Sequence, residues 1–273
     1  MPMTDTYDNR PIAVFDSGVG GISTLSELTT LMPNESYLYF GDSLHAPYGS
    51  RTEEEVRAFA DEHIGRLIEK GAKAVVIACN TTTGAAVSYL REKYAGIPII
   101  GMEPAIKPAV EAYPGGRVLV MATPVTLASG KFRALMGTYE KNAEVIPLPC
   151  PNLAQMVEAG VLEGEALDAY LAELFLPFRD RPADAVVLGC THYPFVREAI
   201  EKAAGKAEIF DGGPGTAREV QHQLEMHGSF TDRTAVGEIS IDNSDPTEER
   251  LRFSEKLLEV GREKCKARMS ESS

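Results

Sequence analysis

Two cysteines stand in matching sequence contexts and could transfer protons. Cys79 and Cys190 each follow a short run of Val, Ile or Leu, and each precedes polar residues at the start of a helix-like segment. A thiol between a strand end and a helix N-terminus faces unpaired backbone amides, which lower its pKa toward neutrality. We therefore expect both thiols to serve as bases near pH 7.

The two contexts are copies of one pattern. Residues 73–81 (KAVVIACNT) align with residues 184–192 (DAVVLGCTH), an offset of 111 from position 79 to position 190. This offset is too long for a solenoid repeat and is typical of two similar domains. A weaker echo pairs residues 15–20 (FDSGVG) with residues 210–215 (FDGGPG). The echoes predict a structural duplication with one thiol in each half.

A structural role for the thiols is the main alternative. A single cysteine after a Val/Ile run is more often a small buried hydrophobe than a catalyst. Burial does not require cysteine at the same strand end in both halves, so the pair favours catalysis. A zinc site is not expected here, because only His192 is a nearby ligand and its spacing fits no standard site. The chain has no C-x-x-C pair, which indicates a reducing compartment.

The residues after each thiol supply hydrogen-bond donors. Asn80 and Thr81 follow the first thiol, and Thr191 and His192 follow the second. Together with helix amides, each pair can form an anion pocket. An imidazolium two residues after the second thiol would favour a thiolate or pass protons. Two such halves facing one another would hold a small substrate with more than one carboxylate.

A glycine-rich turn follows the first predicted strand. Asp16 and Ser17 open this turn, which resembles a dinucleotide-binding fingerprint only loosely and lacks the Gly-Lys-Ser of a P-loop. Its amides can hold a carboxylate, with Asp16 as acceptor or proton partner. A plain turn between strand and helix remains the alternative.

A long polar loop, residues 41–49 (GDSLHAPYG), follows the second predicted strand. Loops at this position carry binding residues disproportionately. Tyr48 and the Gly49 amide can cover a ligand there, although a turn shaped by Pro47 and Gly49 explains the stretch equally well. The remaining histidines lie in this loop or in polar helical segments and receive no predicted role: His45, His63, His222 and His227.

Apolar runs alternate with amphipathic stretches along the whole chain. Helices are expected between most of the runs, for example at residues 22–32 and 52–69, and a last helix at residues 246–264. Apolar runs separated by helices are typical of parallel sheets covered on both faces, so the predicted fold class is α/β. In such sheets ligands bind at the carboxyl ends of the strands, where both thiols fall. The expected strands are residues 11–15, 36–40, 74–78, 97–100, 117–121, 144–147, 185–188 and 208–210.

Composition limits the partners. The 273 residues are enough for about two domains. Lys and Arg number 27 against 40 Asp and Glu, a net charge of −13, which argues against nucleic acid or an anionic membrane as the main partner. No apolar run approaches the roughly 18 residues of a membrane span, and the N-terminus lacks the features of a signal peptide. We expect a cytoplasmic protein.

Four motifs in this order resemble the glutamate racemases of the cofactor-independent aspartate/glutamate racemase superfamily. The resemblance covers roughly residues 11–258, and its first and last motifs separate the glutamate enzymes from their aspartate and hydantoin relatives. The motifs are residues 14–21 (VFDSGVGG), 41–42 (GD) with 47–49 (PYG), 78–81 (ACNT) and 189–194 (GCTHYP).

The resemblance implies roles for individual residues. Cys79 and Cys190 would be the catalytic acid/base pair, one on each face of the substrate, with Asp16 supporting the first thiol and His192 the second. Thr123 and Glu158 resemble further residues near the substrate. The implied substrate-binding residues are Asp16, Ser17, Tyr48, Gly49, Asn80, Thr81, Thr126, Thr191 and His192.

The resemblance also implies an architecture. Two similar doubly wound parallel-sheet α/β domains, related by pseudo-symmetry, would hold the active site in the cleft between them. Residues 1–100 with 211–273 would form the first domain and residues 101–210 the second, so that the chain crosses near Gly101 and returns near Asp211. A homodimer without cofactor or metal is expected, making D-glutamate for peptidoglycan synthesis and cell wall biogenesis.

Two alternatives stay open. An aspartate racemase, or another member of the superfamily, would use the same thiols on a different substrate. A binding protein that closes two lobes around a dicarboxylic amino acid would explain the duplicated anion pockets without needing cysteine in both.

Overall fold

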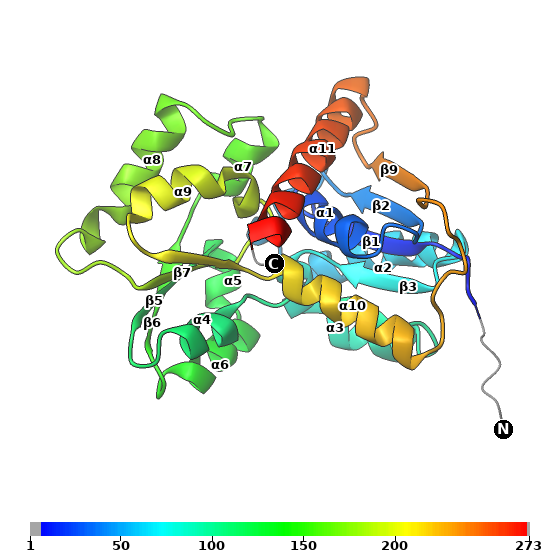
Figure 1. Cartoon of the computed structure of the whole chain (residues 1–273), viewed down its shortest axis with the longest axis horizontal. Helices are drawn as coiled ribbons and strands as arrows, with labels where there is room; N and C mark the ends of the chain where they lie inside the picture. The colour runs from blue at the N-terminus through cyan, green and yellow to red at the C-terminus, as the bar shows by residue number, and fades with distance from the viewer. Residues whose placement is uncertain (1–6, 272–273) are drawn as a thin grey trace. The chain divides into compact units, whose positions relative to one another are not determined.

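The computed structural model describes residues 7–271 (Figure 1). Residues 1–6, on which the expectation about a signal peptide partly rests, lie outside the described residues. The chain divides into two compact units. The first unit holds the residues up to Met102 and those from Gly213 onward, and the second unit is Glu103–Gly212. Among the described residues, no helix is long and apolar enough to cross a membrane.

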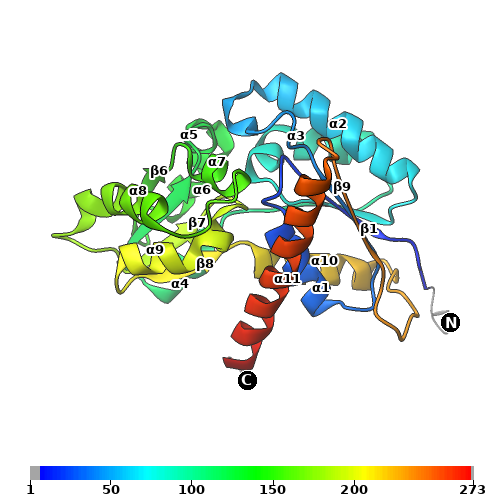
Figure 2. The same ribbon diagram turned by 90° about the horizontal axis from the view of Figure 1, so that it is seen from above.

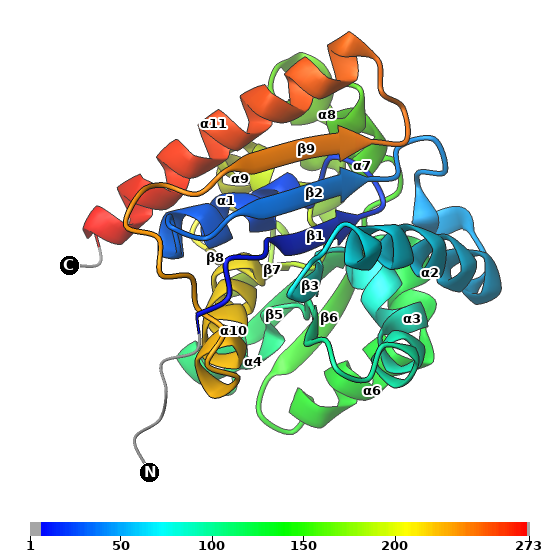
Figure 3. The ribbon, with the colours of Figure 1, turned by 90° about the vertical axis from the view of Figure 1, so that its right-hand side faces the viewer.

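The first unit is built on a five-stranded parallel sheet in the order β4-β3-β1-β2-β9 (Figure 3). Strand β1 lies at its centre and is buried along its whole length, as its continuous apolar run predicts. The strands are β1 (Ile12–Asp16), β2 (Tyr37–Gly41), β3 (Ala74–Ile77), β4 (Ile99–Gly101) and β9 (Ile239–Asn243).

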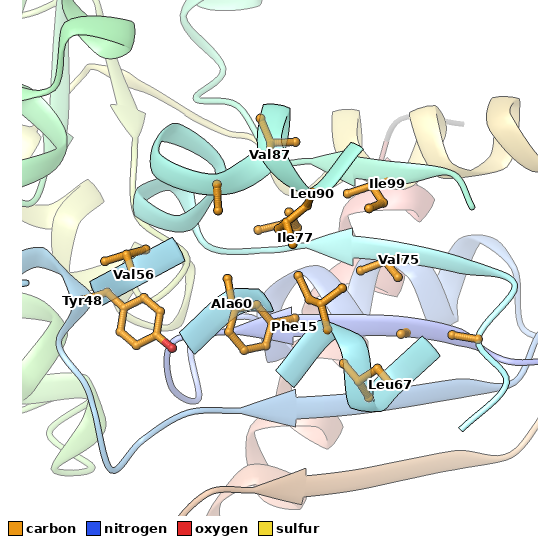
Figure 4. Close-up of a cluster of buried hydrophobic side chains, with 14 residues drawn as sticks. Phe15, Tyr48, Val56, Ala60, Leu67, Val75, Ile77, Val87, Leu90 and Ile99 are labelled. Atoms are coloured by element: carbon orange, nitrogen blue, oxygen red, sulfur yellow. The ribbon is translucent and has the colours of Figure 1, made fainter. Parts of the chain in front are cut away.

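Helices cover both faces of this sheet, and Figure 2 shows α2 and α3 on one side of β1 and α1, α10 and α11 on the other. The core under α2 and α3 joins Phe15 and Ile77 of the sheet to helix residues such as Ala60 and Leu90 (Figure 4). The helices are α1 (Ile22–Leu31), α2 (Glu53–Glu69), α3 (Asn80–Lys93), α10 (Gly213–Met226) and α11 (Glu248–Glu271), with a short 3₁₀ helix η1 (Tyr48–Ser50).

Strand β9 was not predicted from the sequence. It lies at the edge of the sheet beside β2. Its sequence, ISIDN, lacks the apolar run that identified the other eight strands, and Asn243 is its only buried residue. The final helix, predicted at residues 246–264, begins at Glu248 and continues to Glu271.

The second unit contains a four-stranded parallel sheet in the order β6-β5-β7-β8. Helices α4 and α6 cover one face through a core that includes Ile106, Val118, Phe132 and Val187, and α8 and α9 lie on the other face (Figure 1). The strands are β5 (Arg117–Ala122), β6 (Glu144–Pro149), β7 (Ala185–Leu188) and β8 (Glu208–Asp211). The helices are α4 (Ile106–Ala112), α5 (Pro124–Ala128), α6 (Gly130–Tyr139), α7 (Leu153–Glu158), α8 (Glu165–Phe175) and α9 (Arg197–Ala204), with 3₁₀ helices η2 (Leu176–Phe178) and η3 (Tyr193–Val196).

The two sheets share one strand topology. The order β4-β3-β1-β2 in the first unit corresponds to β8-β7-β5-β6 in the second. Strand β3, which precedes Cys79, therefore has its counterpart in β7, which precedes Cys190, and the stronger sequence echo reflects a structural duplication. The weaker echo does not, because it pairs β1 with β8, and these strands occupy different positions in their sheets. The predicted α/β class with two parallel-sheet domains is confirmed.

Candidate active site

Cys79 lies where β3 ends and α3 begins. Its backbone is extended and it caps the helix, with its Sγ atom accepting from the Thr82 amide at 3.5 Å. The Ser17 hydroxyl, in the turn after β1, lies 3.4 Å from the same sulfur. The thiol is buried. Ser17, which the sequence analysis lists among the substrate-binding residues, thus lies beside the first thiol.

The pKa of Cys79 is shifted in the direction opposite to our expectation. Burial raises the pKa of this thiol, and the charge of the Asp16 carboxylate raises it further. Hydrogen bonds from Ser17 and Thr82 lower it without reversing the shift. The prediction of a thiol acidified by the helix N-terminus was wrong here, because it neglected desolvation and the neighbouring carboxylate.

The turn after β1 holds Asp16 close to the sheet. Asp16 is fully buried and its Oδ2 atom accepts from the Gly18 amide at 3.1 Å. A Cβ atom at Gly21 would lie 2.5 Å from the Cβ of Asp16, closer than two carbon atoms can approach. Only glycine at position 21 leaves room for the Asp16 side chain beside the start of α1.

Asn80 and Thr81 are the first two residues of α3. The Asn80 amide nitrogen lies 3.6 Å from the Met102 sulfur. The Asn80 Oδ1 atom is buried and has no hydrogen-bond partner among the described residues. A buried acceptor without a partner costs free energy, which an ammonium group of a ligand would recover.

The loop after β2 contains Tyr48 and Gly49, both predicted to bind a ligand. Tyr48 is buried against the α2 core (Figure 4), and its hydroxyl donates to Asp42 Oδ2 at 2.6 Å. Burial alone would raise the pKa of Asp42, but the neighbouring His63 and the Tyr48 hydroxyl lower it well below its usual value. The Tyr48 hydroxyl is therefore already hydrogen-bonded to Asp42. Gly49 is the next residue of the 3₁₀ helix η1.

The second thiol lies in a chain of three polar groups. Cys190 follows β7, and its sulfur lies 3.6 Å from His192 Nδ1. The other ring nitrogen of His192 lies 2.7 Å from Glu158 Oε1, at the last residue of α7. The sequence predicted both His192 and Glu158 near the substrate, and the structure joins them directly.

His192 is held in its charged form. Burial alone would lower the pKa of this imidazole, but its hydrogen bonds with Cys190 and Glu158 raise it well above the usual value. An imidazolium beside a thiol stabilises the thiolate. The surroundings of the two thiols are therefore electrically opposite, a carboxylate beside Cys79 and an imidazolium beside Cys190.

The other predicted residues of the second unit also lie at the carboxyl ends of its strands. Thr123 follows β5 and caps α5, with its hydroxyl 2.9 Å from that of Thr126. Thr126 and Thr191 are both buried. Each unit thus brings its thiol and its predicted binding residues to one edge of its own sheet.

The sequence analysis placed Asp42 in a motif and considered His63, but it gave neither residue a role. Asp42 directly follows β2, just as Asp16 is the last residue of β1. This similarity of position could have identified Asp42 from the sequence. His63 was assigned to a polar context, but the structure buries it. It lies on the apolar face of α2, seven residues after Val56 and one before Ile64, a helical spacing that was visible in the sequence.

Comparisons with known proteins agree with this geometry. A family model described as Asp/Glu/Hydantoin racemase matches residues 22–220. The chain is 49% identical to the glutamate racemase of Clostridium perfringens (strain SM101 / Type A) over 259 residues, covering 94% of this chain and 100% of that protein.

Solved structures give the same result. The crystal structure of glutamate racemase from Francisella tularensis in complex with D-glutamate matches with a TM-score of 0.80 and 30% identity, covering 92% of this chain and 94% of that one. Escherichia coli glutamate racemase, in complex with L-glutamate and the activator UDP-MurNAc-ala, matches with a TM-score of 0.81 and 28% identity, covering 92% and 95%. The chain therefore belongs to the Asp/Glu/Hydantoin racemase family.

Proposed function

We propose that this protein is a glutamate racemase, an isomerase that interconverts L-glutamate and D-glutamate by proton transfer between two cysteines without a cofactor. One observation carries the proposal: Cys79 and Cys190 each lie two residues after equivalent strands, β3 and β7, of two sheets with the same topology. The names of the relatives and the glutamate complexes of two similar structures support glutamate as the substrate.

Inversion of a carbon centre requires two groups. One must remove the α-proton from one face, and another must deliver a proton to the opposite face. We assign these tasks to the two thiols, one for each face of the substrate carbon. The duplication supplies one thiol for each face.

The charges beside the two thiols differ. Burial and the Asp16 carboxylate raise the pKa of Cys79 and favour its neutral form, whereas Cys190 lies beside the His192 imidazole, whose pKa is raised. In one direction the Cys190 thiolate removes the α-proton and becomes a thiol. The Cys79 thiol then delivers its proton to the other face and becomes a thiolate. The reverse direction begins from this exchanged state, so no proton is gained or lost overall.

The remaining predicted residues would bind the substrate. The unpartnered Asn80 Oδ1 atom suits the ammonium group. Amides and hydroxyls of Ser17, Thr81, Thr126 and Thr191 would hold the carboxylates, with Gly49 contributing its amide. Donors aimed at a carboxylate stabilise the negative charge that develops on it when the α-proton leaves.

The biological setting is also a proposal. We propose that the two units are the two domains of the enzyme, that it acts as a homodimer in the cytoplasm, and that D-glutamate from this reaction supplies peptidoglycan synthesis. These statements rest on the resemblance of the four motifs to glutamate racemases.

A substrate panel tests the proposed function. Purified protein without added cofactor is incubated separately with L-glutamate and L-aspartate, and optical rotation is followed. We expect the rotation of L-glutamate to decay to zero and that of L-aspartate to persist. If only the rotation of L-aspartate decays, the protein is an aspartate racemase and the proposed substrate is wrong. If glutamate binds and its rotation does not decay, the protein is a binding protein.

A further inference from the structure

Three side chains that can bind a metal converge where β2 ends. Asp42, His45 and His63 each offer one ligand atom, and these atoms all lie within 4.8 Å of one another. His45 Nδ1 lies 2.8 Å from Asp42 Oδ1, and His63 Nε2 lies 3.3 Å from Asp42 Oδ2. Two ligands of a tetrahedral zinc ion, each bound at about 2.1 Å, are separated by roughly 3.4 Å. The cluster is therefore close to the spacing that zinc requires.

His63 has no other evident partner. Its side chain is 6% exposed, its Nε2 atom lies near Asp42 alone, and its Nδ1 atom has no hydrogen-bond partner among the described residues. The ring lies between Phe15, at a centroid distance of 5.9 Å, and Phe40, at 4.6 Å. A buried imidazole whose polar contacts are so few is unfavourable unless another group binds one of its nitrogens.

Solvent can reach the cluster through His45. Its side chain is 39% exposed, whereas that of Asp42 is fully buried. The His45 ring stacks on Phe59 at 4.2 Å, which holds its Nδ1 atom beside the carboxylate. Two imidazoles and one carboxylate are a typical ligand set for zinc, with water as the fourth ligand.

We infer that Asp42, His45 and His63 form a binding site for one Zn²⁺ ion, with water in the fourth position. The site connects the loop after β2 to helix α2. Asp42 also accepts the Tyr48 hydroxyl at 2.6 Å, so the ion would stabilise the part of the loop that leads to Gly49. The ion takes no part in proton transfer, and the inference does not depend on the proposed racemase function.

Calorimetric titration with ZnCl₂ tests the site. Thiols also bind zinc, so wild-type protein is compared with the Cys79→Ser/Cys190→Ser variant, and His45→Ala and His63→Phe are made in that background. We expect this double-serine background to bind one ion per chain, and each histidine change to weaken binding by at least about tenfold. His227→Ala, an exposed histidine on the same unit, should leave binding unchanged.

Thermal unfolding with and without ZnCl₂ separates ligand loss from misfolding. Zinc should raise the Tm of the double-serine background and leave that of its folded His45→Ala variant unchanged. His45 lies on a loop and is partly exposed, so this variant decides the matter even if His63→Phe does not fold. Loss of all zinc binding with the thiols, or zinc binding that both histidine variants retain, would overturn the inference.

Discussion

At the scale of single residues, the two thiols differ in the charge beside them. Cys79 lies near the buried carboxylate of Asp16, and Cys190 lies 3.6 Å from His192, which Glu158 holds from the other side. Because a proton donor and a proton acceptor are needed at the same moment, opposite surroundings prepare the free enzyme for both tasks.

Replacing either thiol should abolish most of the activity. A serine hydroxyl is far less acidic than a thiol, so Cys79→Ser and Cys190→Ser should each lower kcat for racemisation by at least ~10²-fold. Polarimetry with purified variants measures the loss. Cys265→Ser, in helix α11, is the matched control and should keep the wild-type rate. Full activity in either of the first two variants would exclude the two-cysteine mechanism.

Removing the Glu158 charge should change the pH profile. Glu158 helps to raise the pKa of His192, so Glu158→Gln lowers that pKa and the imidazolium is lost at a lower pH. The alkaline limb of kcat/KM against pH should therefore move to lower pH in the variant. Glu163→Gln, at an exposed residue after α7, is the control. An unmoved alkaline limb would show that Glu158 does not act through His192.

The sequence predicted which residues form the site better than it predicted their pKa values. The thiols, His192 and Glu158 were found because their types and motifs are visible in the sequence. The raised pKa of Cys79 was not foreseen, because burial and the distance to Asp16 depend on packing between β1 and β3. The contact between Asp42 and His63 depends on how α2 packs against the loop after β2, and no local sequence pattern specifies that packing.

At the scale of elements, the strand ends position the site. In the first unit β1, β2 and β3 run parallel, so Asp16, Asp42 and Cys79 are brought to one edge of the sheet. In the second unit β5 and β7 place Thr123 and Cys190 in the same way. Each helix that follows then begins beside a polar side chain. The arrangement follows from parallel strands and short turns.

The start of β3 depends on a buried ion pair. The Lys73 ammonium, which is fully buried, lies 2.6 Å from Glu35 Oε2 and also donates to the Asp8 and Ser229 carbonyls. Lys73→Met leaves the Glu35 charge buried without its cation. We expect the free energy of unfolding to fall by about 3–5 kcal/mol, measured by urea denaturation.

Two further variants control this prediction. Lys73→Met combined with Glu35→Gln removes both charges and should be less destabilised than Lys73→Met alone. Lys107→Met, at an exposed lysine, should change stability little. A loss below ~1 kcal/mol for Lys73→Met would place the buried pair in the range of exposed ion pairs and contradict the argument.

Element prediction succeeded where the apolar signal was continuous. All eight predicted strands overlap strands of the structure. Strand β9 was not predicted because its sequence, ISIDN, places a polar residue after each isoleucine and so contains no apolar run. Helix α11 extends beyond its predicted C-terminal end at residue 264 because the charged residues that follow contain no signal that ends a helix.

At the scale of the whole molecule, the chain contains one strand order twice. The order β4-β3-β1-β2 returns as β8-β7-β5-β6, and the second unit, Glu103–Gly212, is inserted into the first. The duplication was predicted from the echo around the two thiols alone. The weaker echo between β1 and β8 shows the limit of this reasoning. A glycine-rich turn after an aspartate can connect any strand to the helix that follows it, so the shared residues do not imply equivalent strands.

Deuterium incorporation into each enantiomer tests the central claim most directly. L-glutamate is racemised in deuterated water, the reaction is stopped early, and the α-carbon of each separated enantiomer is analysed for deuterium. With one thiol on each face, the proton removed by the first thiol is not the one delivered by the second. The account predicts that the D-glutamate formed carries deuterium and the recovered L-glutamate does not. Equal deuterium in both enantiomers at early times would indicate a single base and contradict it.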